Sequence, residues 1–218
     1  MTETERRDRL IQWLKVIYGD VQHLMINDHL FWEFQEVVHN NDRFKSASGL
    51  FTQFIATSYT QSAAVGVRRQ AKLGDDSASA MRFLDELRKY PQLVSRAYNT
   101  GLYAGMEDWQ IDMGQRDFDN VAGPGSLHVP AALAEKQMAD VKTAVSRIEH
   151  FVDRRVAHLD NRNLAQPLPK FFEITDALRA LETIVILYWR LLTGGSLRTL
   201  LPTIQDDWKD IFRFTWEP

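Results

Sequence analysis

The chain has 218 residues, enough for one domain with a substantial buried core. Its net charge of −3 excludes a general attraction to nucleic acid, so any RNA contact has to come from a local basic cluster. It contains no cysteine, which excludes disulfides, thiolate zinc sites and cysteine nucleophiles. The charged start, MTETERRDRL, lacks the character of a signal peptide, and charges interrupt the most apolar window, ALRALETIVILYWRLL. We therefore expect a cytoplasmic protein without membrane contact.

Apolar residues recur at steps of three and four along most of the chain, and this spacing predicts helices rather than strands. Gly19-Asp20 suggests a kink or a break within the first helix. Pro91 ends the third helix, and Pro130 stands at a favourable first position of the fourth. The predicted helices cover residues 3–40, about 46–73, 77–90, about 130–159 and 170–193.

Residues 101–128 differ from the rest because they hold five glycines and Pro124 and show no clear period. They predict a long loop insertion before the helix that follows Pro130. Trp109 and the acidic residues of this insertion suit a protein partner better than an RNA backbone. The tail, residues 195–218, is aromatic-rich, and a helix is one option for residues 204–214. We predict one all-α domain over residues 1–218, an up-and-down helical bundle.

The densest charge lies in residues 151–162, FVDRRVAHLDNR, at the end of the fourth predicted helix. Steps of seven and four residues place Arg147, Arg154 and His158 on one stripe, with Asp160 just beyond the helix end. A histidine exchanges protons near neutral pH, and a guanidinium stabilises a charged phosphate. These groups are the minimum for metal-free RNA cleavage, in which a 2′-hydroxyl attacks the adjacent phosphate.

A purely structural interpretation of the same helix end also stands. Basic residues near a helix C-terminus complement the helix dipole, and Asp160 can pair with Arg154 or Arg155. The neighbouring stripe of Val145, Ile148 and Val152 is expected to be buried.

The stretch DRRVAHLD resembles the signature of the HEPN superfamily, in its AbiU-type, abortive-infection branch. Three further stretches are similar to the family's neighbouring helices, and the resemblance leaves out the 101–128 insertion and the tail. These stretches are LFTQFIATSYTQSAAVGVRRQAK, DDSASAMRFLDEL and FFEITDALRALETIVILYW.

The resemblance implies a helical bundle that forms a homodimer with two motif helices facing each other. His158 matches the motif histidine, Asp160 the acidic residue after it, and Asp153 the polar residue that follows the motif arginine. Val152 occupies the position of that arginine, so Arg154, with Arg155 or Arg147 as substitutes, would supply the cation.

Many members of the family are ribonucleases of toxin–antitoxin or antiphage systems, so the resemblance implies an endoribonuclease that needs no metal or other cofactor. RNA is the expected substrate, and an antitoxin or another protein is a possible partner. The competing interpretation is a catalytically inactive HEPN module that binds nucleic acid or a protein.

Two other patterns carry weaker hypotheses. Arg68, Arg69 and Lys72 form a basic cluster late in the second predicted helix, which can contact RNA phosphates or complement the helix dipole. A Glu-x-x-His pattern in the first helix has the spacing of di-iron bundles but lacks a second copy, so metal binding is a minor alternative. Its residues are His29, Glu33, Glu36 and His39.

Overall fold

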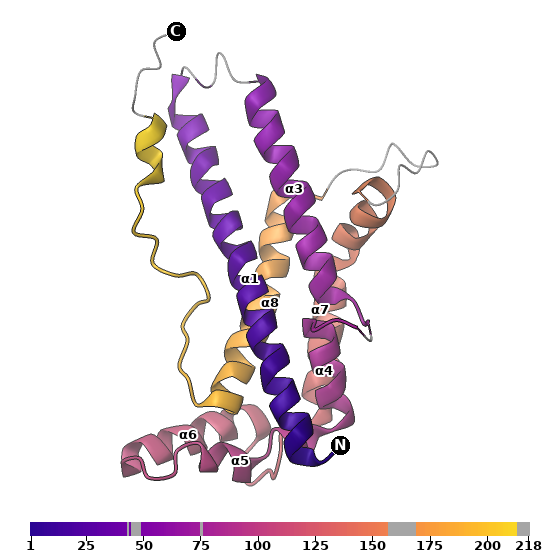
Figure 1. Cartoon of the computed structure of the whole chain (residues 1–218), viewed down its shortest axis with the longest axis vertical. Helices are drawn as coiled ribbons and strands as arrows, with labels where there is room; N and C mark the ends of the chain where they lie inside the picture. The colour runs from indigo at the N-terminus through magenta and orange to yellow at the C-terminus, as the bar shows by residue number, and fades with distance from the viewer. Residues whose placement is uncertain (43, 45–48, 75, 157–168, 213–218) are drawn as a thin grey trace.

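The computed structural model describes residues 1–42, 44, 49–74, 76–156 and 169–212. All regular elements in these ranges are helical, apart from an isolated antiparallel bridge between Ser95 and His128. The predicted all-α up-and-down bundle is therefore confirmed (Figure 1). Within the same ranges no helix combines the length and the apolarity needed to cross a membrane. The long helices are α1 (Glu3–Asn40), α3 (Gly49–Ala71), α7 (Ala131–Phe151) and α8 (Phe171–Thr193).

Helix α1 is the longest element, and it packs against α3 and α8. The predicted break at Gly19-Asp20 is wrong, because the helix runs unbroken through both residues. The apolar stripe stays buried on both sides of Gly19, and Asp20 accepts hydrogen bonds from Arg69 and Gln70 of α3. The buried apolar residues of α1 are Leu10, Leu14, Ile17, Val21, Leu24, Phe31 and Phe34.

Local sequence signals set most of the helix ends. Thr2 and Glu5 form a capping box at the start of α1. Ser79 caps α4 (Ala80–Lys89), which packs on α1 and α7 and ends just before a 3-10 turn at Pro91–Leu93. Helix α8 ends at Gly194, whose φ of +70° is a left-handed conformation that glycine adopts without strain.

The predicted 101–128 loop is wrong over most of its length, because Asp108–Ala122 form helix α6. Helix α6 and the short α5 (Arg96–Gly101) lie across one end of the bundle (Figure 1). The apolar period of α6 is weak because most of the helix is exposed, with Gly114 and Phe118 its buried residues. Gly114, which suggested a loop, serves packing instead: an added Cβ would lie 2.3 Å from the Tyr103 ring.

Arg96, at the start of α5, binds residues of α6 and of the segment that follows it. Its guanidinium donates to Asp119 at 2.5 Å and to the Ser126 carbonyl at 2.8 Å, and it lies over the Phe118 ring. From α8, Arg190 reaches Asp117 at 3.4 Å. These contacts hold the segment as a folded part of the domain.

One polar cluster, in which Asp28 and Tyr59 are buried, joins three long helices. The Asp28 carboxylate of α1 accepts hydrogen bonds from the Tyr59 hydroxyl of α3 and, at 2.8 Å, from the Thr175 hydroxyl of α8. Burial, and then the hydrogen bond to Asp28, raise the pKa of Tyr59 far above its usual value, so the phenol stays a donor. The Phe31 ring stacks on Tyr59 with centroids 3.9 Å apart.

The described part of the tail lies along α1 (Figure 1), and Trp208–Phe212 form a 3-10 turn where a helix was one option. Glu33 of α1 accepts hydrogen bonds from Lys209 at 2.6 Å and from Trp208 at 3.0 Å. The hydrogen bond from Lys209 is the main reason why the pKa of Glu33 lies below its usual value. The Phe212 ring packs against Phe34.

The close approach of Gly114 to Tyr103 gives a test of this arrangement. We expect Gly114→Ala to push the ring out and destabilise the α5–α6 segment by about 1–3 kcal/mol, the usual range for overpacking. Amide hydrogen exchange over residues 96–128 measures the effect as lost protection. Gly101→Ala is the matched control, since a Cβ there meets nothing within 4 Å. Equal protection in the two variants would contradict the packing described for α6.

Candidate functional site

The helix that carries the predicted motif is anchored in the core along one face. The predicted buried stripe is confirmed, since Val145, Ile148 and Val152 are all buried. After Phe151 the α-helix widens into a π-helical turn over Val152–Val156. Such turns shift the angular register of the side chains, and they are frequent at functional sites.

Arg147 is tied to the neighbouring helix. Its guanidinium lies 2.5 Å from the Glu173 carboxylate in the first turn of α8 and remains half-exposed. Glu173 also accepts a hydrogen bond from the backbone N–H of Lys170, which caps α8. Arg147 thus helps to hold α7 and α8 together where the candidate site begins.

Asp153 also has a partner on another helix. Its carboxylate lies 2.5 Å from the guanidinium of Arg68, which reaches across from α3. Arg154 is half-buried, and no ion pair joins it to another described residue. His158, Asp160 and the side chain of Arg155 lie outside the described residues. The closeness of Arg154 to His158 stays a prediction.

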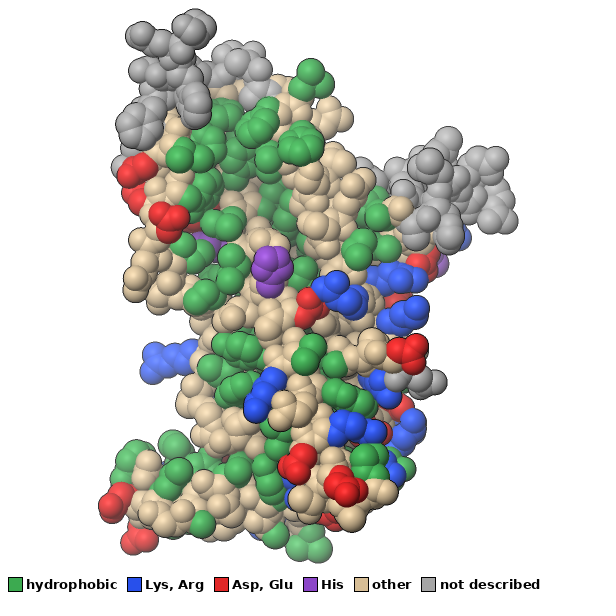
Figure 2. Space-filling model, viewed as in Figure 1, with side chains coloured by type: hydrophobic (Ala, Val, Ile, Leu, Met, Phe, Trp, Pro, Cys, Tyr) green, Lys and Arg blue, Asp and Glu red, His purple; other side chains and the backbone are tan. Residues whose placement is uncertain are grey.

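The predicted basic cluster of α3 divides between two neighbours. Arg68 forms an ion pair with Asp153, beyond the end of α7. Arg69 forms an ion pair with Asp20 of α1. Lys72 is exposed. Figure 2 shows basic and acidic side chains interspersed along the edge that carries α3, α4 and α7. The ion pairs leave less unpaired charge for phosphate contacts than the sequence suggests. RNA binding by these residues stays a prediction.

The first-helix pattern gives no metal site within the described part of the chain. His29 lies 3.5 Å from Glu33, but Glu33 is already bound by Trp208 and Lys209. Within the described ranges, no group of three or more histidine, aspartate or glutamate side chains could hold a metal ion.

The local pattern around the motif gave no signal for the two ion pairs that frame it. Arg68–Asp153 and Arg147–Glu173 join residues that only the tertiary fold brings together. Asp28 was also missed, although a signal existed. It lies four residues after Leu24 and three before Phe31, on the buried stripe of α1. A carboxylate at such a position indicates a buried polar contact.

Comparison with protein families identifies the chain, because the HEPN model described as AbiU2 matches residues 8–211. This protein belongs to the AbiU2 family of HEPN proteins. The predicted family, an abortive-infection branch of HEPN, is confirmed, and the match extends across α5, α6 and most of the tail. No curated protein and no solved structure matches the chain.

Val152 gives a direct test of the motif's anchoring in this AbiU2 protein. It is 3% exposed, so Val152→Arg would put a guanidinium into the core rather than restore the usual signature. We expect a loss of several kcal/mol in the free energy of unfolding, because burying an unpaired ion is costly. Urea denaturation followed by circular dichroism measures it.

Val65→Arg on α3 is the matched control, since Val65 is 39% exposed. It should change the free energy of unfolding by no more than about 0.5 kcal/mol. If Val152→Arg were as stable as Val65→Arg, position 152 would be open to an arginine and its assignment to the core would be wrong.

Proposed function

We propose that this AbiU2 protein is a metal-independent endoribonuclease that acts in phage defence by abortive infection. The observation that carries the proposal is the family match together with a motif that keeps its histidine, His158. Arg154, in the π-helical turn four residues earlier, is the candidate cation in place of Val152. Its lack of a described ion-pair partner leaves its charge for a phosphate.

The chemistry needs no bound metal. One His158 takes the proton of the 2′-hydroxyl as its oxygen attacks the neighbouring phosphorus. The bond from phosphorus to the 5′-oxygen breaks, and a second His158 gives that oxygen a proton. The products are a 2′,3′-cyclic phosphate and a 5′-hydroxyl. Arg154 stabilises the charge on the phosphate oxygens, and Arg147 or Arg155 are its substitutes. Asp153 and Asp160 orient the histidine and the arginine.

The need for two histidines makes a homodimer part of the proposal. Large apolar side chains are exposed on the first turns of α3, namely Leu50, Phe51 and Phe54. Figure 2 shows an apolar area near the end of the molecule where α3 begins. A contiguous exposed apolar surface commonly marks an association site. Such a surface supports self-association or the binding of an antitoxin.

The second candidate function is a catalytically inactive module that binds nucleic acid or a protein. The burial of Val152 favours it, because the usual position of the motif arginine belongs to the core. In this case α6 is the candidate contact for a protein partner. Its exposed face carries Trp109 and Met113 beside Asp108 and Asp112.

The test incubates the purified full chain with end-labelled single-stranded and structured RNAs in EDTA. We expect cleavage with cyclic-phosphate ends. His158→Ala should slow it by about 10²–10⁴-fold, the usual contribution of a general acid or base. Arg154→Ala should slow it by about 10²-fold or more, as for loss of a charge-stabilising donor. Light scattering on the same sample should give twice the mass of the chain.

His150→Ala is the matched control, since His150 is an exposed histidine at the end of the same helix. It should cleave like the wild type. Cleavage that survives in folded His158→Ala would show that the activity does not come from this site. No cleavage by the wild type at high protein concentration would favour the binding module.

A further inference from the structure

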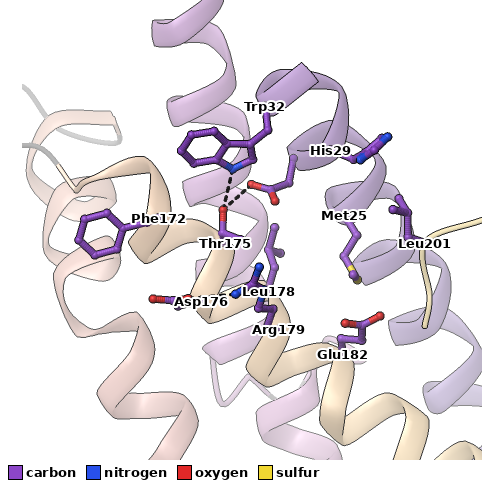
Figure 3. A pocket seen from close by; sticks show the side chains of 11 residues that line it. Met25, His29, Trp32, Phe172, Thr175, Asp176, Leu178, Arg179, Glu182 and Leu201 are labelled. Atoms are coloured by element: carbon purple, nitrogen blue, oxygen red, sulfur yellow. Dashed lines mark hydrogen bonds and ion pairs between the residues drawn. The ribbon is translucent and has the colours of Figure 1, made fainter. Parts of the chain in front are cut away.

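A pocket of about 430 Å³ lies between α1 and α8, with Leu201 of the tail at its edge (Figure 3). Trp32 and Thr175 meet at one end of it, and Arg179 and Glu182 lie at the other. None of the described motif candidates lines this pocket. Its volume is within the range of small-molecule sites, which is about 300–1,000 Å³.

Asp28 reaches this pocket with one free oxygen. The residue is only 9% exposed, and its Oδ1 accepts both hydroxyl hydrogen bonds, from Tyr59 and Thr175. Among the described residues, no donor bonds to Oδ2. In the described ranges, the one side-chain nitrogen or oxygen that is fully buried and has no hydrogen bond is Nε of Arg9. Oδ2 of Asp28 has no hydrogen bond either, so it must be accessible to solvent. Oδ2 therefore opens onto the pocket that Asp28 lines.

The neighbouring side chains reinforce the negative character of the pocket. Asp28, Asp176 and Glu182 are three carboxylates, against one guanidinium, Arg179, and at most one charged histidine, His29. The side chains of Arg179 and Asp176 are 72% and 63% exposed and lie 3.9 Å apart, so this pair sits at the rim and its two charges offset each other. An anionic ligand would meet net repulsion here, and a cation would meet attraction.

Trp32 supplies an aromatic wall with a fixed orientation. Its indole N–H donates to the Thr175 hydroxyl at 3.0 Å, and that hydroxyl in turn donates to Asp28. An indole face beside a carboxylate is a favourable site for an ammonium or guanidinium group. Met25, Leu178 and Leu201 add apolar surface, which suits methylene groups.

We propose that this pocket binds an organic cation, a primary ammonium or guanidinium group on a short methylene chain, with Asp28 as its counter-ion. The cation lies against the Trp32 ring, and the methylene groups contact the apolar wall. The same chemistry is present in free polyamines and in lysine or arginine side chains of a protein. The site is independent of the proposed nuclease chemistry.

Isothermal titration calorimetry of the full chain at low salt tests the proposal. The probes are putrescine, agmatine and spermidine as free cations, and N-acetyl-lysine amide and N-acetyl-arginine amide as models of protein side chains. We expect saturable binding of at least one probe. Tighter binding of the free amines indicates a small-molecule ligand, and tighter binding of the capped residues indicates a protein side chain.

Asp28→Asn is the decisive variant, because it keeps an acceptor for Tyr59 and Thr175 and removes the charge. It should weaken binding at least tenfold. Asp20→Asn is the matched control on the same helix. Asp20 is also hydrogen-bonded to α3 but does not line the pocket, so affinity should stay within twofold.

Trp32→Leu gives an independent measurement, because Trp32 is 39% exposed and is not one of the buried core residues. It should weaken binding several-fold, whether or not Asp28→Asn folds. Absence of binding by the wild type at millimolar concentrations of every probe would overturn the proposal. So would an unchanged affinity in Trp32→Leu or in folded Asp28→Asn.

Discussion

The Asp28 carboxylate is the contact on which the relative placement of α1, α3 and α8 depends. Burying a charged group is costly unless hydrogen bonds replace its lost hydration, and two hydroxyl donors do so here. An aliphatic side chain at position 28 would suit the surrounding stripe. It would also leave the buried Tyr59 hydroxyl without its acceptor. The carboxylate therefore fixes which faces of the three helices meet, in addition to filling space.

At the end of α7, the buried face of the helix coincides with the usual position of the motif arginine. Val152 continues the buried face of the helix, where a guanidinium would be unpaired, so packing excludes the usual motif arginine there. Arg154 lies two residues later in a π-helical turn and is half-buried, so it reaches the surface that Val152 cannot. A π-helical turn inserts an extra residue into the helix and shifts the direction of the side chains that follow. The widened turn thus lets the core keep its valine while an arginine lies nearby.

The fold was predictable where burial follows a regular period, and less so elsewhere. The stripe on α1 predicted a long helix, since nearly every third or fourth residue is apolar. Helix α6 escaped prediction because it buries little, and because Gly114 is required by the Tyr103 ring rather than by a turn. The contacts of Arg68 and Arg96 join residues far apart in the sequence, so the local pattern contains no trace of their partners. The pocket depends on Asp28, whose place on an apolar stripe was a usable signal.

The first turns of α8 connect the motif helix with the pocket. Glu173 caps α8 and binds Arg147 of α7, while Thr175, two residues later, binds Asp28 from a different face. Below these turns α8 is packed by large buried side chains, and a close-packed core resists small displacements. A ligand bound to the Asp28 carboxylate would lie against the first turns of α8, where Glu173 also binds Arg147. The two surfaces share one structural support, although neither lends a residue to the other.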